Sequence, residues 1–217
     1  MKKKWIIILS VVSIILLAFV MMGPLMSNVE EPIYQVITSE GRIDIRQYPP
    51  MIIAEVKVEG KREEAIGGGF RVLADYIFGN NIVQQEIAMT APVQQQNSEK
   101  IAMTAPVQQQ SENGLWKISF VMPSEYRLET LPKPINKAVT LKEVPGESYV
   151  AIRFSGLNSN KNITQYEKEL MQYVATNQIK TVGSLKYAFY NPPWTLPFMR
   201  RNELMFEVEN IPQDVGG

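Results

Sequence analysis

A long apolar segment near the N-terminus constrains the fold of this chain more than any other feature of its sequence. The segment runs from Trp5 to Met22, and only Ser10 and Ser13 interrupt it. As a helix, its 18 residues would span roughly 27 Å, which matches the hydrocarbon core of a bilayer. We therefore expect one transmembrane helix, and the remaining length suits one globular domain that folds beside the membrane.

The charged residues on either side of this segment predict its orientation. Three lysines at positions 2–4 precede it, whereas Glu30 and Glu31 follow it with no basic residue before Arg42. The positive-inside rule places the N-terminus in the cytoplasm and the domain outside it. A cleaved signal peptide, which would leave the domain secreted or periplasmic, stays open as an alternative, although residues 21–24 form a poor cleavage site.

The chain is accordingly expected to divide into five parts. These are a cytoplasmic basic tip at 1–4, a transmembrane signal anchor at 5–22, a linker at 23–31, a domain at 32–210 and a tail at 211–217. Beyond residue 22 the chain holds 19 basic and 22 acidic residues. This slightly acidic balance argues against a nucleic-acid partner, which usually meets a basic surface.

The complete absence of histidine and cysteine excludes several kinds of chemistry. Without cysteine there are no disulfides, no thiolate nucleophile and no lipid-modified N-terminal cysteine. Without histidine there is no Ser-His or Cys-His catalysis, and the commonest protein ligand of zinc and haem iron is missing. Any reaction would depend on carboxylates, lysine, tyrosine or hydroxyl groups.

Two patterns of strands around a helix follow one another along the domain. In the first, alternating residues predict strands at 34–38, 42–48 and 51–59, and apolar residues at helical spacing predict a helix over 61–78. Gly67-Gly68-Gly69 within that helix allows either a close approach of a flat ligand or close packing against a sheet. Strands are expected at 115–122, 139–144, 149–154, 184–190 and 203–208, with a helix from a capping box at Thr164 to Asn177.

A segment of ten residues occurs twice without change. Ile87-Ala-Met-Thr-Ala-Pro-Val-Gln-Gln-Gln96 recurs as residues 101–110. Each copy is expected to form a short strand that ends at its proline, followed by a polar loop of glutamines. The order of elements is then ββαββ, a proline-rich crossover and ββαββ again. This order predicts an α+β domain of two pseudo-symmetric halves.

Five sequence motifs resemble those of the SOUL, or haem-binding protein, family. They occur in the family's order and are Ile87-Ala-Met-Thr-Ala-Pro-Val93 with its repeat, Trp116-Lys-Ile-Ser-Phe-Val-Met-Pro123, Leu131-Pro-Lys-Pro134, Ala151-Ile-Arg-Phe-Ser-Gly156, and Tyr190-Asn-Pro-Pro-Trp194 leading to Pro197-Phe-Met-Arg-Arg-Asn-Glu203. The resemblance implies a distorted antiparallel β-barrel with two flanking helices. It also implies binding of haem or another tetrapyrrole as a ligand, without chemical turnover.

The resemblance further implies a hydrophobic cleft beside the first helix of the domain, with basic residues near the ligand's carboxylates. The matching positions in this chain are the candidate ligand-binding residues Phe70, Arg71, Leu73, Ala74, Ile77, Tyr190, Trp194, Arg200 and Arg201. Gly67 and Asp75 stand where the family has basic residues. Met89 and Met103 are weak candidates for an axial iron ligand, with core packing as the alternative.

Structural roles stay open for the other candidates too. Arg200-Arg201 are expected either to clamp a carboxylate or to form an ion pair that ties the last strand to a neighbour. Tyr190 and Trp194 are expected either to form a wall for a flat ring or to cover the end of the core. For the whole protein, the alternatives to tetrapyrrole binding are a binder of another small hydrophobic ligand, a structural envelope protein, and a small-molecule hydrolase of the related GyrI-like type.

Overall fold

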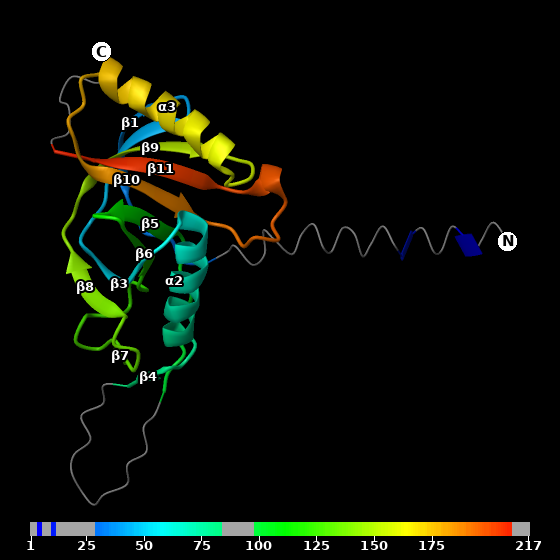
Figure 1. Ribbon diagram of the computed structural model, residues 1–217, viewed down its shortest axis with the longest axis vertical. Coiled ribbons are helices and arrows are strands. Elements are labelled where there is room, and N and C mark those ends of the chain that lie inside the picture. The colour runs from blue at the N-terminus through cyan, green and yellow to red at the C-terminus, as the bar shows by residue number, and fades with distance from the viewer. Residues whose placement is uncertain (1–3, 6–9, 12–28, 84–97, 210–217) are drawn as a thin grey trace, which may run out of the picture.

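The alternating segments of the sequence join into one nine-stranded antiparallel sheet with a helix beside each half (Figure 1). The computed structural model describes residues 4–5, 10–11, 29–83 and 98–209. The expected transmembrane helix at 5–22 and the linker before residue 29 therefore lie almost entirely outside the described residues. Among the residues that are described, no helix is both long and apolar enough to cross a bilayer.

The described elements agree closely with the expected strands and helices. In chain order they are β1 Gln35–Glu40, β2 Ile43–Gln47, β3 Met51–Val58, α2 Arg62–Ile77, β4 Asn81–Ile82, β5 Val107–Glu112, β6 Leu115–Val121, β7 Lys133–Pro134, β8 Thr140–Val144, β9 Ser148–Phe154, α3 Asn160–Thr176, β10 Thr181–Phe189, the 3₁₀ turn η1 Pro197–Met199, and β11 Asn202–Val208. Short strands β4 and β7 pair separately from the large sheet.

The two halves are built alike and exchange one strand each. The sheet order is β1-β2-β9-β11-β10-β5-β6-β3-β8, so each half has a βαββ unit, either β3-α2-β5-β6 or β9-α3-β10-β11. Strand β2 precedes β3 in the chain but pairs with β9, and β8 precedes β9 but pairs with β3. The expected pseudo-symmetry is present, and the exchange means that neither half completes its sheet without the other.

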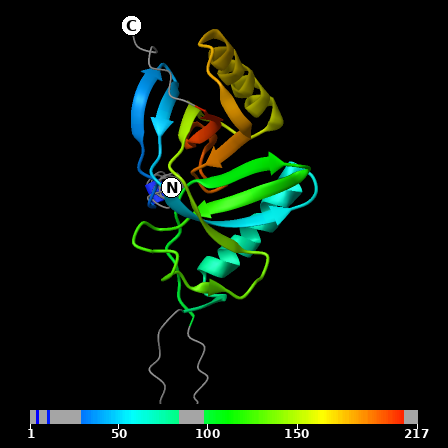
Figure 2. The same cartoon turned by 90° about the vertical axis from the view of Figure 1, so that its left-hand side faces the viewer.

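Both helices cover the same face of the sheet. Paired residues of antiparallel strands lie on one face, and the register carries one face continuously from Ile118 through Gln109 and Tyr187 to Leu204. Helix α2 packs on β3 and β6 around Ile118 and Phe120. Helix α3 packs on β9 and β11 around Ile152 and Leu204. Neither α2 nor α3 lies on the opposite face, as the side view also shows (Figure 2).

Three expectations about this architecture are wrong. No closed barrel forms among the described residues, because the sheet ends at β1 on one side and β8 on the other. Helix α3 begins at Asn160, because the hydroxyl of Ser159 accepts from the amide of Asn162 and caps it before Thr164 is reached. In the second copy of the repeat, the strand begins after Pro106, and the glutamines at 108–110 lie within β5.

The three successive glycines of α2 have different surroundings. A Cβ atom on Gly69 would lie 2.9 Å from the side chain of Ile118 on β6, so this glycine lets the helix pack closely on the sheet. A Cβ atom on Gly68 would have room, since the nearest side chain, that of Val58, would lie 3.8 Å away, and a Cβ atom on Gly67 would meet nothing within 4 Å. Packing therefore explains Gly69 and leaves Gly67 without a structural reason.

Alanine substitutions at Gly67 and Gly69 are expected to change stability in opposite directions. Gly67→Ala should raise the free energy of unfolding by up to about 1 kcal/mol, because alanine is the better helix former and meets no neighbour. Gly69→Ala should lower it by about 1–3 kcal/mol, the usual cost of overpacking against a core side chain such as Ile118. Denaturant unfolding of the two variants measures the difference. Equal effects would show that the helix does not approach the sheet at Gly69.

Candidate functional site

Helix α2 divides its predicted ligand-binding residues between the core and the surface. Leu73 and Ile77 are fully buried and pack with Ala54 and Phe120 of the sheet. A ligand could reach them only if the helix left the sheet. Phe70 and Ala74 are half-buried, and Arg71 is exposed. The structure thus brings three of the five predicted α2 residues to the surface.

One side of α2 carries small or aromatic residues around a single arginine, although the charged residues Glu63, Glu64 and Asp75 are exposed beside it. Gly67, Phe70, Arg71, Ala74 and Phe78 follow one another at helical spacing, which places them on one side of the helix. Phe70 contacts the ring of Phe120 edge-on, with 5.5 Å between the ring centres. Phe78, at the C-cap, is exposed. We call Gly67, Phe70, Arg71, Ala74 and Phe78 the α2 face.

One cation lies on the α2 face. The Nε atom of Arg71 donates to the carbonyl oxygen of Gly67 at 3.1 Å, so the side chain is held near this glycine without filling the space that a Cβ of Gly67 would occupy. Asp75, one turn further on, is hydrogen-bonded by the side-chain amide of Asn80. The terminal nitrogens of Arg71 therefore offer donors to an added carboxylate.

The predicted arginines near the last strand lie in a different place, around a buried carboxylate. Glu203 on β11 accepts from Arg46 at 2.7 Å, from Arg201 at 2.9 Å and from Arg153 at 3.2 Å. The hydroxyl of Tyr190 donates to the same carboxylate at 2.9 Å. Arg46 and Glu203 are both completely buried. We call this group the Glu203 cluster.

The charges of the Glu203 cluster stabilise one another. Burial alone would raise the pKa of Glu203, but the hydrogen bond and charge of Arg46 and the charge of Arg201 hold that pKa below its ordinary value. Burial, together with the charge of Glu203, raises the pKa of Tyr190. The carboxylate is thus ionised and the phenol protonated at neutral pH, which is the arrangement of a structural ion pair.

Arg200 and Arg201 are occupied by protein acceptors. Arg201 also donates to Glu31 at 2.6 Å, and it stacks over the ring of Tyr190 at 3.8 Å. Arg200 donates to the carbonyl oxygens of Thr195, at 2.7 Å, and of Pro193. Both side chains therefore fix the chain around the proline-rich loop, Arg201 through ion pairs with Glu31 and Glu203 and Arg200 through carbonyl oxygens.

The remaining predicted ligand-binding residues lie far apart and differ in exposure. Tyr190 is buried within the Glu203 cluster, whereas Trp194 is 57% exposed. Met103 is exposed just before β5, and Met89 lies outside the described residues. Within the described ranges no three acidic side chains come together as a metal site would require. A ligand-binding role for Tyr190, Trp194, Arg200, Arg201 and the two methionines stays a prediction.

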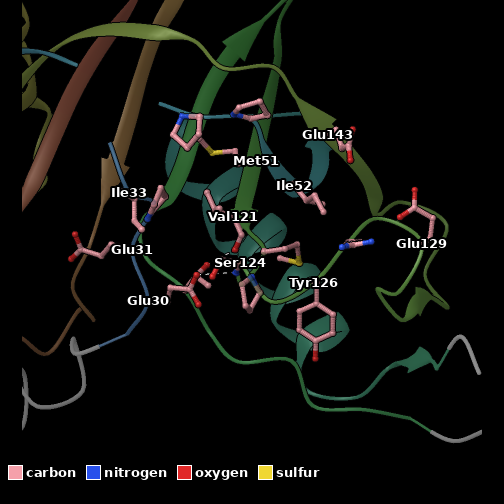
Figure 3. Close-up of a pocket in the computed structure, with 17 residues that line it drawn as sticks. Glu30, Glu31, Ile33, Met51, Ile52, Val121, Ser124, Tyr126, Glu129 and Glu143 are labelled. Atoms are coloured by element: carbon pink, nitrogen blue, oxygen red, sulfur yellow. Dashed lines mark hydrogen bonds between the residues drawn. The ribbon is translucent and has the colours of Figure 1, made fainter. Parts of the chain in front are cut away.

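A hollow of about 410 Å³ lies where the N-terminal strap, residues 29–34, crosses the beginning of β3 (Figure 3). Its floor is apolar and includes Met51, Ile52 and Val121, with Tyr126 on one side. Glutamates surround it: Glu30 and Glu31 on one side, and Glu129 and Glu143 on the other. Arg127 is the one basic residue among the described residues that line it. Its size suits a small ligand, and the carboxylates would repel an anionic one.

A second hollow, of about 280 Å³, lies on the helix-free face between the two halves. Its charges pair within the lining, since Lys142 is 3.0 Å from Glu55 and Lys186 is 3.5 Å from Glu147. Lys186 also lies over the ring of Tyr149, 4.4 Å from its centre. Burial, with the hydrogen bond and charge of Glu147, raises the pKa of Tyr149, so its phenol stays protonated.

Sequence reasoning missed both hollows and the role of Arg46. Alternation in residues 42–48 places Arg46 on the face opposite Ile43 and Ile45, which normally indicates solvent. A second layer of chain, from Tyr34 and Tyr190, covers that face instead, with the ring of Tyr34 4.5 Å from the guanidinium of Arg46. No local signal in the sequence reports such a cover.

Comparison with known proteins supports the resemblance found in the motifs. The model of the family described as "SOUL heme-binding protein" matches residues 29–207, most of the chain. The chain belongs to the SOUL heme-binding protein family. No curated protein matches this SOUL chain in sequence.

Solved structures resemble this SOUL domain in fold alone. The C-terminal domain of EcmrR has a TM-score of 0.54 at 13% identity, over 82% of this chain and 99% of its own. A hydrolase from Listeria innocua has a TM-score of 0.51 at 14% identity, over 79% of this chain and 94% of its own. At these identities, neither likeness carries a function to this chain.

Removal of the buried charge at Glu203 is expected to destabilise the domain strongly. Glu203→Gln should lower the free energy of unfolding by about 3–5 kcal/mol, since it leaves the buried Arg46 with only the partly exposed Asp44, at 2.7 Å, as its anion. Glu207→Gln, on the same face of the same strand, is the control. Burial and the charge of Glu147 raise the pKa of Glu207, so its ionised form contributes no comparable stability.

The same pair of variants tests the pH dependence. The folded-state pKa of Glu203 lies below the unfolded value of about 4.5, so its contribution is complete above that pH and is lost as the pH falls through the folded pKa. The stability gap between the wild type and Glu203→Gln should therefore narrow below about pH 4.5. Denaturant unfolding at several pH values measures it, and a gap that stays constant down to about pH 3 would contradict an ionised Glu203.

Proposed function

We propose that this protein binds haem or a related tetrapyrrole on the α2 face, without turning it over. The observation that carries the proposal is the open surface at Gly67. A side-chain atom added there would meet nothing within 4 Å, although glycine weakens an exposed helix by up to about 1 kcal/mol. A flat ligand that lies against the helix backbone would explain why glycine occupies this position.

The composition of the α2 face suits such a ring. Gly67 and Ala74 carry almost no side chain, so a planar molecule can approach the helix closely on either side of Phe70, with the exposed Phe78 beyond Ala74. Covering about 200 Å² of apolar surface would contribute about 5 kcal/mol. Arg71 adds two-pronged donors for a propionate at the edge of the ring.

The residues present fit a tetrapyrrole held by its ring and by a single carboxylate. The chain has no histidine, so the apolar contacts and Arg71 must supply most of the affinity. A bound haem would bring a redox-active iron, and no residue on the α2 face supplies an acid, a base or a nucleophile for a reaction of its own. This supports binding without catalysis.

The charges that flank the apolar segment support a location for this binding. With lysines before residues 5–22 and glutamates after them, the domain would be held at the outer surface of the membrane. A ligand that partitions between lipid and water would be captured there. If the segment is cleaved, the same domain would act as a secreted or periplasmic binder.

The hollow in Figure 3 supports a second candidate, the binding of another small hydrophobic ligand. Its apolar floor resembles that of many ligand pockets, but four glutamates surround it and one arginine opposes them. A dianionic haem is disfavoured at such a rim. A neutral or cationic molecule fits it better, so the two candidates differ in the charge of the ligand.

Titration of the full chain in detergent with haemin tests the main proposal. We expect a saturable Soret shift near one haemin per chain. Gly67→Leu should weaken binding by at least tenfold, because its side chain occupies the space of the ring while the free helix tolerates it. Arg71→Glu should also weaken binding, because it replaces the donor to a propionate with a like charge. Ala175→Leu, an exposed position on α3, should leave binding unchanged.

The outcomes separate the function from its site. Absence of a saturable shift would overturn tetrapyrrole binding altogether. A shift that survives both Gly67→Leu and Arg71→Glu would leave the function and move the site elsewhere, and mass spectrometry of molecules that co-purify with the chain would then test the second candidate.

A further inference from the structure

The loop between β10 and β11 exposes large apolar side chains at one edge of the domain. Trp194 is 57% exposed, and Phe198, within η1, is 73% exposed. Leu157 is also exposed, and it lies beside this loop because the amide of Gly156 donates to the carbonyl of Pro197 at 2.8 Å. We call Trp194, Phe198 and Leu157 the aromatic edge.

The aromatic edge is held rigidly by the chain beneath it. Arg200 closes the loop through the carbonyl oxygens of Thr195 and Pro193, and the amide of Thr195 donates to the carbonyl of Pro192 at 3.0 Å. Asn202 donates to the carbonyl of Gly156 at 3.0 Å. A loop that is bonded this completely keeps its aromatic side chains at the surface, where they are ready to meet an apolar partner.

The N-terminal strap brings this edge close to the expected membrane segment. Glu31 bonds to Arg201 at 2.6 Å, immediately beside the loop. Ile33, on the same strap, is exposed as well. Val29, where the strap begins, follows Met22, the end of the apolar segment, by seven positions. Fully extended, this stretch spans at most about 25 Å, so the edge cannot move far from a membrane that holds residues 5–22.

We propose that the aromatic edge docks on the lipid surface in which residues 5–22 are anchored. Tryptophan concentrates at membrane interfaces, where its ring meets the acyl chains and its N–H group stays hydrated. Phe198 and Leu157 supply purely apolar contacts beside it. A lipid surface, unlike a protein pocket, accepts such side chains without a shaped partner, and the tether supplies it at high local concentration.

Basic groups beside the edge suit this partner. Arg62, at the start of α2, donates to the carbonyl of Asn158 at 3.3 Å, next to Leu157. Lys161, in the first turn of α3, is exposed. Lys161 lies where the headgroups of anionic lipids would meet the domain, whereas the guanidinium of Arg62 lies over the ring of Tyr187, 5.4 Å from its centre. The docked domain would therefore have one orientation on the membrane instead of swinging freely on its linker.

Site-directed labelling of the full chain in vesicles tests the proposal. Because the chain has no cysteine, Phe198→Cys and Leu157→Cys each create a single site for a nitroxide label. Met171→Cys is the control, because Met171 is 52% exposed near the other end of α3. In vesicles of phosphatidylcholine with anionic phosphatidylglycerol, we expect labels at 198 and 157 to be accessible to oxygen and shielded from a water-soluble nickel complex. The label at 171 should be accessible to the nickel complex.

Two further measurements make each outcome decisive. Flotation of the same vesicles measures whether the chain is bound to the membrane at all, independently of whether the aromatic edge touches the lipid. A floating chain whose label at 198 is as water-accessible as the label at 171 overturns the proposal, and so does a chain that does not float. Trp194→Ser should make the label at 198 at least fivefold more accessible to the nickel complex. Its melting curve should stay unchanged, since most of the Trp194 side chain is exposed.

Discussion

The buried carboxylate of Glu203 determines how the parts of this domain are joined. Two of its partners come from β2 and β9, which are distant in sequence from β11, and the others come from the proline-rich loop that directly precedes β11. An ionised group without solvent is tolerated only when its hydrogen bonds are nearly complete, so the buried position of Glu203 in the folded domain depends on these segments being in place. Because Arg201 also bonds to Glu31, the same carboxylate fixes the N-terminal strap and the loop that carries the aromatic edge. The proposed lipid-facing surface is therefore a consequence of the cluster in the core.

The proposed ligand surface depends on a different constraint, which is the closeness of α2 to the sheet. Gly69 allows the helix backbone to approach Ile118, so that Leu73 and Ile77 fill the core completely. That packing leaves only the outward side of the helix for a ligand. A flat ligand could lie against that side because Gly67 has no Cβ atom to hold it away from the helix. Arg71 would supply the positive charge beside it. A helix that packed less closely would expose its core residues and offer a cleft instead of a face.

Local patterns predicted the elements well and the long-range pairing poorly. The periodicity of residues 61–78 predicted α2 to within one residue at each end, since one apolar side of a helix is visible in the sequence. Nothing local indicates that β2 pairs with β9 while β8 pairs with β3, because alternation shows which side chains share a face but not which strand lies next. The same limit concealed Arg46, whose burial depends on chain that lies far away in the sequence. The prediction for the glutamines of β5 was wrong for a related reason. Their polarity indicated an exposed loop, but β5 lies at the junction between the two halves, and Gln109 is buried there.

The α2 face and the aromatic edge belong to the same folded domain, so docking of one on the membrane would also orient the other. Arg62, in the first turn of α2, bonds to the segment that follows Leu157, so the helix with the ligand face begins beside the lipid-facing edge. From Gly67 to Phe78 the face extends along twelve residues, about 16 Å of helix. A docked edge would hold the near end of this face close to the headgroups and the far end in water. An amphipathic ring with an apolar body and a carboxylate could then pass from the bilayer to the helix without crossing open solvent, with Arg71 near the first turn of the face to meet its charged end.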